Sequence, residues 1–113
     1  MALSYVVNNY PEGTSGAAET FTLASADQTA FPRFFGFSLT SLKAALQSGA
    51  VGLGMADPSI KAAVQGLIQA SLIGGGASVG AATARAAVIV DRGNGSAARS
   101  NELALLILAD VGA

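Results

Sequence analysis

The chain has 113 residues and a net charge of −1, and its 12% of charged residues is about half the share in an average soluble domain, which is about 25%. It contains neither cysteine nor histidine, which excludes disulfides, thiolate or imidazole catalysis, and metal sites with Cys or His ligands. An enzyme built on this chain would need carboxylate, lysine, tyrosine or cofactor chemistry, and the length predicts one domain over residues 1–113.

The N-terminal third carries strand and loop patterns. Residues 3–8 are rich in β-branched and aromatic side chains and predict a short strand. Residues 8–33 contain many Asn, Pro, Gly, Thr and Ser residues and predict an extended, loop-rich segment, interrupted by an alternating stretch at 20–25 that suits a half-buried strand. The apolar stretch at 34–39 predicts a third strand, with Gly36 marking a bulge or a close approach.

Two helices are predicted in the middle of the chain. The first begins near Thr40 or Ser41 as its N-cap and ends at Gly49. The second has Asp57 as its N-cap and Pro58 at its first position, and ends at Gly74. Its apolar side chains recur at helical spacing, at Ile60, Ala63, Val64, Leu67, Ile68 and Leu72.

The C-terminal part is less clear from its pattern. Residues 78–87 predict either a short helix or the approach to a strand at 86–91. Residues 102–110 are continuously apolar, which suits a buried strand or a buried helix, and pairing with 86–91 across an Asn94-Gly95 turn favours a strand. The sequence therefore predicts a small single α+β domain with short strands at both ends and two or three central helices.

The segment GGGASVGAATAR, followed by AAVIVDR, resembles the nucleotide-binding turn of short-chain dehydrogenases. The resemblance places Gly74, Ser78 and Gly80 at the three glycine positions of that turn and Asp91 at the end of the following strand. It implies a pyrophosphate held against the Gly74–Gly80 loop and a ribose held by Asp91. The match departs from the family at Ile73, where a threonine is expected, and at Ser78. Both tyrosines lie upstream, so the family's Tyr-x-x-x-Lys active site has no counterpart here.

A second short resemblance concerns residues 48–59, SGAVGLGMADPS, which are similar to a stretch near the carboxyl end of a small RNA-phage coat protein. The rest of the chain does not follow that family's order of strands followed by helices.

Two groups of residues are candidates for a contact surface. Four of the five phenylalanines lie between residues 31 and 37, and such a cluster forms either core or a subunit contact. Small residues recur along one face of the helix predicted at 57–74, where they favour close packing. The candidate interface residues are Phe31, Phe34, Phe35, Phe37, Ala63, Gly66 and Ala70.

These observations favour a self-assembling structural subunit (a virion coat, shell or filament protein) with no catalytic activity, no cofactor and no metal. A core of small aliphatic side chains stabilises a chain modestly, and a surface poor in charge gives little protection against association. The alternatives are a small nucleotide- or phosphate-binding module using the Gly74–Gly80 loop, and a membrane-associated protein with residues 60–90 in lipid.

The expected partner is the chain itself, in a homo-oligomer of high order. Nucleic acid is a possible partner, but Arg85, Arg92 and Arg99 are the only local concentration of basic residues in a chain of net negative charge. No stretch reaches the roughly 20 apolar residues of a membrane span. We expect no signal peptide, because the N-terminal residues lack a basic region and a continuous apolar run. The compartment stays unassigned, a virion being one location that fits the structural hypothesis.

Overall fold

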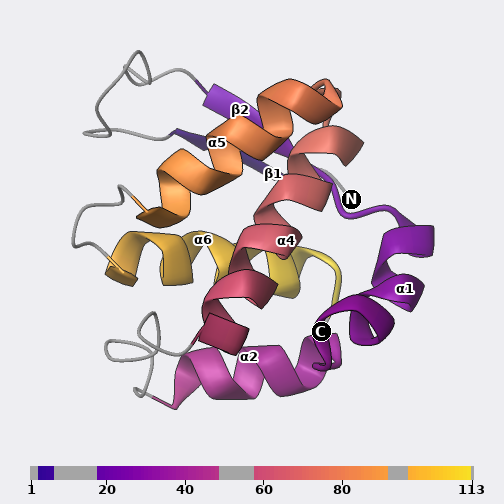
Figure 1. Ribbon diagram of the computed structural model, residues 1–113, viewed down its shortest axis with the longest axis vertical. Coiled ribbons are helices and arrows are strands. Elements are labelled where there is room, and N and C mark those ends of the chain that lie inside the picture. Colours follow the sequence, from indigo (N-terminus) through magenta and orange to yellow (C-terminus); the bar gives the residue numbers. More distant parts are fainter. Residues whose placement is uncertain (1–2, 7–17, 49–57, 92–96, 113) are drawn as a thin grey trace.

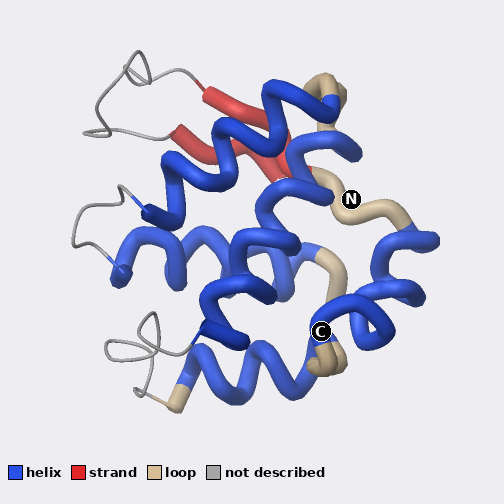
Figure 2. The backbone as a smooth tube through the Cα atoms, viewed as in Figure 1, coloured by secondary structure: helices blue, strands red, loops and turns tan. Residues whose placement is uncertain are grey.

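A computed structural model describes residues 3–6, 18–48, 58–91 and 97–112, which form a two-stranded sheet followed by five helices (Figures 1 and 2). The strands are β1 (Leu3–Val6) and β2 (Ala18–Phe21). The helices are α1 (Ser25–Phe35), α2 (Leu39–Gln47), α4 (Pro58–Gly74), α5 (Val79–Asp91) and α6 (Ala97–Asp110).

Helix α4 is the centre of the fold. It crosses the middle of the view in Figure 1 and contacts α1, α5, α6 and β2. The helix predicted at 57–74 is confirmed, and its apolar periodicity is the reason for its position, since the buried side chains recur every three or four residues. They are Ala63, Val64, Leu67, Ile68, Ser71 and Leu72.

The α+β prediction is wrong, because the described chain is mostly helical and the only strands lie near the N-terminus. Residues 86–91 belong to α5 and residues 102–110 belong to α6. In both segments the buried side chains follow a helical period, which a continuous apolar run conceals. In α5 they are Ala82, Ala86, Ile89 and Val90, and in α6 they are Leu103, Ala104, Ile107 and Leu108.

The two strands form an antiparallel hairpin that packs against the end of α4. Leu3 pairs with Phe21, and the strand predicted at 3–8 is confirmed over residues 3–6. The strand predicted at 20–25 is shorter than expected, because β2 ends at Phe21. The next residue, Thr22, donates its backbone N–H to the carbonyl oxygen of Ser71 at 2.8 Å. This bond joins the residue that follows β2 to the last turns of α4.

Helix α1 corrects two further expectations. Residues 25–33 lie in α1 rather than in an extended loop, and Pro32 lies within the helix. The strand predicted at 34–39 is absent, because α1 ends at Phe35 with Gly36 as its left-handed cap at a φ of 74°. Residues 8–17 of the predicted N-terminal segment lie outside the described part of the chain.

The helix predicted at 40–49 is present as α2, with a different cap. The side chain of Ser38 accepts a hydrogen bond from the backbone N–H of Ser41 at 3.0 Å, so the N-cap lies two or three residues earlier than the predicted Thr40 or Ser41. The predicted caps Gly49 and Asp57 and the turn at Asn94-Gly95 lie outside the described ranges.

Candidate interaction site

Three phenylalanines gather at the C-terminal end of α1. Phe31 is buried in the core, and its ring centroid lies 4.8 Å from that of Phe35. The Phe34 centroid lies 6.4 Å from that of Phe35, yet Phe34 is 77% exposed. The cluster therefore begins in the core and ends at the surface with one ring in solvent.

The Phe35 ring lies directly against the backbone of α4 at Gly66. A Cβ atom at Gly66 would lie 2.6 Å from Cε1 of Phe35, closer than real Cβ contacts come. Glycine inside a helix costs roughly 1 kcal/mol relative to alanine, and the close approach of the ring explains its presence here. Part of the small-residue face of α4 is thus covered by α1 of the same chain.

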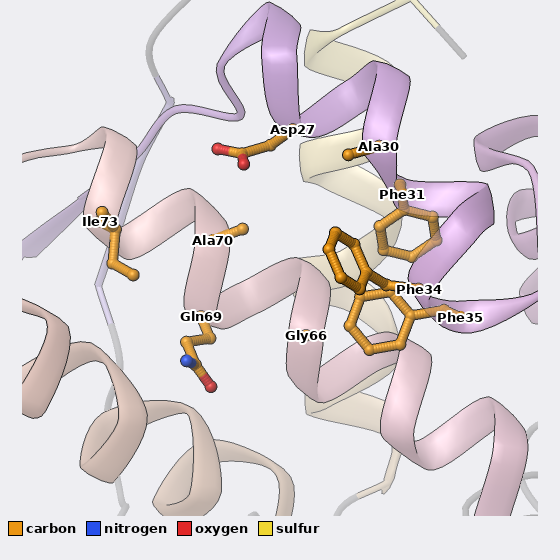
Figure 3. A pocket seen from close by; sticks show the side chains of 9 residues that line it. All are labelled: Asp27, Ala30, Phe31, Phe34, Phe35, Gly66, Gln69, Ala70 and Ile73. Carbon is orange, nitrogen blue, oxygen red and sulfur yellow. The ribbon is translucent and has the colours of Figure 1, made fainter.

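Beyond Phe35, α1 and α4 enclose a surface hollow of about 210 Å³. Figure 3 shows the three rings at one end of it, with Ile73 and the carboxylate of Asp27 at the other. The side chains that line it are mostly apolar and come from these two helices. They are Asp27, Ala30, Phe31, Phe34, Phe35, Gly66, Gln69, Ala70 and Ile73.

The size of the hollow restricts what it can hold. Sites for small molecules and cofactors usually measure about 300–1,000 Å³. An apolar cavity of about 150 Å³ already admits a benzene ring. At about 210 Å³, this hollow suits one aromatic or aliphatic side chain better than a cofactor.

The structure brings together five of the seven candidate interface residues, since Phe31, Phe34, Phe35, Gly66 and Ala70 all line the hollow. The other two do not belong to it. Ala63 is fully buried, which leaves it unavailable to a partner, and Phe37 packs against the core elsewhere.

Four residues of the hollow were not among the sequence candidates: Asp27, Ala30, Gln69 and Ile73. A signal for them exists. Asp27 and Ala30 lie one or two turns before Phe34 on α1, and Ile73 lies one turn after Ala70 on α4. Extending each candidate face by a turn would have found them.

Two charged side chains of α1 bear on the hollow, Asp27 in its lining and Arg33 directly before Phe34 in the sequence. Asp27 lies in the first turn of this helix and Arg33 in its last, and both side chains are exposed. Within the described part of the chain, neither has an ion-pair partner. The apolar hollow thus has one carboxylate without an ion-pair partner in its lining, and an arginine without one directly precedes its exposed ring in the sequence.

The glycines that resemble a nucleotide-binding turn have another role at the end of α4. A Cβ at Gly74 would collide with the carbonyl oxygen of Thr22 and lie 2.9 Å from its carbonyl carbon. A Cβ at Gly75 would collide in the same way with the carbonyl group of Thr20. These two glycines therefore let the backbone of β2 pack against the end of α4.

The remaining positions of that resemblance also lack the expected context. Ser78 caps α5 by accepting a hydrogen bond from the N–H of Ala81 at 3.2 Å, and Gly80 has nothing within 4 Å of an added Cβ. Asp91 ends a helix, whereas the resemblance places it at the end of a strand. The segment is a helix–turn–helix in place of the strand–turn–helix that a dinucleotide site requires.

Arg85, considered above as part of a basic cluster, is held within the fold. Its Nε and one terminal nitrogen donate to the two carboxylate oxygens of Glu19, each at 2.7 Å. This bidentate pair joins β2 to α5, and both side chains are largely buried. The side chains of Arg92 and Arg99 lie beyond the described residues, as does most of the 48–59 segment.

No family model matches the sequence, and no curated protein and no solved structure matches it. In the described ranges, no three acidic side chains come together where they could hold a metal ion. None of the described helices combines the length and the hydropathy needed to cross a membrane.

Proposed function

We propose that this protein is a self-associating structural subunit, of the kind that builds a virion coat, shell or filament, and that it has no catalytic activity. The observation that carries the proposal is the 77% exposed ring of Phe34 beside an apolar hollow. An exposed aromatic side chain at the edge of an apolar depression is typical of a protein–protein contact.

The composition supports the same conclusion. Only 12% of the residues are charged, so charge repulsion between copies is weak. The absence of histidine and cysteine removes the thiolate nucleophile and the side chain used most often for acid–base catalysis. The hollow is also smaller than the usual small-molecule site.

No observation in the described residues favours the nucleotide-binding alternative. The space next to Gly74 and Gly75, where a phosphate would have to approach the backbone, is filled by the carbonyl groups of Thr22 and Thr20. The membrane-associated alternative likewise has no supporting helix among those described.

The test is the solution mass of the purified protein, measured by light scattering over a range of concentrations, with a negative-stain grid from the same peak. We expect a mass of many subunits with regular particles or filaments. A monodisperse monomer of 11.1 kDa at every concentration would contradict the proposal. A thermal-shift panel of NAD and ATP, run on the same sample, should give no shift.

A further inference from the structure

We infer that the hollow between α1 and α4 receives the Phe34 ring of a second copy of this chain, in a reciprocal two-fold contact. The inference rests on the proposed function and specifies the first interface of the assembly. Each copy would insert one ring and accept one.

The exposed Phe34 ring and the hollow belong to one surface patch. Phe34 lines the hollow and projects from its edge, with 77% of its surface exposed. A contact that uses the same patch on both copies is related by a two-fold axis, the commonest symmetry of homo-oligomers. A patch with both a ring and a space for a ring is complementary to itself.

The volume of the hollow fits one inserted side chain. About 210 Å³ exceeds the roughly 150 Å³ that admits a benzene ring. It is too small for a helix, whose diameter with side chains is about 10–12 Å. Ala70 lines the hollow with a side chain of one methyl group, which leaves the space beside Phe35 open. One inserted side chain therefore fits, and an aromatic ring matches the aromatic end of the hollow shown in Figure 3.

The charges on α1 also suit such a contact. Arg33 directly precedes Phe34, so a second copy that inserts Phe34 brings a basic residue with the ring. The hollow it enters is lined by Asp27 of the first copy. Neither charge has an ion-pair partner within the described part of its own chain. Two-fold symmetry forms this pair twice.

The first test separates specific insertion from general stickiness. Phe34→Ala removes both inserted rings, and we expect dimer dissociation at concentrations at least about a hundredfold higher than for the wild type, since each buried ring contributes about tenfold or more. Ala70→Leu fills the hollow from within. This substitution should also weaken the dimer, although it adds apolar surface. If association were non-specific, the added apolar surface would strengthen it. Val79→Ala is the matched control, since Val79 is 65% exposed and lies outside the hollow.

The second test uses the charges. Asp27→Arg and Arg33→Asp should each weaken self-association by about tenfold, because each places like charges together twice. An equimolar mixture of the two variants should restore association through a heterodimer, in which both contacts again join opposite charges. Analytical ultracentrifugation and native mass spectrometry resolve homodimers from heterodimers, and 1 M salt should reduce the differences because the Debye length there is about 3 Å.

These experiments distinguish a failure of self-association as a whole from a failure of the Phe34 contact alone. Wild-type protein that stays monomeric overturns the proposed function. Wild-type assemblies that survive unchanged in Phe34→Ala and Ala70→Leu overturn the inference alone, and assembly then uses another face. Circular dichroism of each variant checks the fold, which should be intact in the Phe34, Asp27 and Arg33 variants because these side chains are exposed.

Discussion

The contact between β2 and the end of α4 predicts opposite effects for two glycines of one motif. Gly74→Ala places a methyl group against the carbonyl of Thr22, a backbone group that moves only if β2 moves with it. Gly80→Ala, six residues later, places the same methyl group in open space. A nucleotide-binding loop would make both glycines matter for ligand binding.

The magnitude follows from what must shift. Overpacking of this kind costs about 1–3 kcal/mol. Displacing β2 also strains the hydrogen bond from Thr22 to Ser71, worth about 0.5–1.5 kcal/mol. The higher helix propensity of alanine at position 74 offsets less than about 1 kcal/mol of this loss. We expect Gly74→Ala to lower the free energy of unfolding by about 2 kcal/mol, and Gly80→Ala to change it by between 0 and about 1 kcal/mol in the stabilising direction.

The assay is thermal unfolding of both variants beside the wild type, followed by circular dichroism at one protein concentration because self-association shifts Tm. For a chain of this length, about 2 kcal/mol corresponds to a fall in Tm of about 8 °C. Indistinguishable melting of Gly74→Ala and Gly80→Ala would refute the close approach of β2 to α4.

Three further predictions concern single interactions. Glu19→Gln should lower the free energy of unfolding by about 2 kcal/mol, because it breaks a largely buried bidentate pair with Arg85, and a double-mutant cycle in urea should show coupling between the two residues. Ser38→Ala should cost about 1 kcal/mol by removing the acceptor for the N–H of Ser41, with faster amide exchange in the first turn of α2 as its local signature. Leu67→Ala should cost about 2–5 kcal/mol in chemical denaturation, since Leu67 lies fully buried at the centre of α4, and a loss below 1 kcal/mol would contradict that position.

The sequence allowed the prediction of α4 and α2 but not of the C-terminal helices. Helix α4 has a proline at its first position and a clear apolar period, two signals that agree. In α5 the β-branched run at 88–90 favours a strand locally, whereas packing of its alanines against α4 favours the helix. Between Glu102 and Asp110 every residue is apolar, so the pattern has no polar face and periodicity alone does not distinguish a strand from a helix.

The candidate site was predictable in parts but not as a whole. The aromatic cluster and the small face of α4 are visible in the sequence, because each is a local pattern. Their meeting is not, since the residues of α1 and α4 that line the hollow lie more than thirty positions apart, and no local rule states which helices pack together. The hollow arises only from that packing, and the burial of Ala63 is decided there as well.

The approach of β2 to the end of α4 also constrains how this sequence can diverge. Descendants that keep the fold must keep a residue without a side chain at 74 and 75, because the neighbouring atoms belong to the backbone and no substitution in β2 removes them. Position 80 is under no such restriction. We therefore expect sequences that keep this fold to keep the adjacent glycine pair at the end of α4.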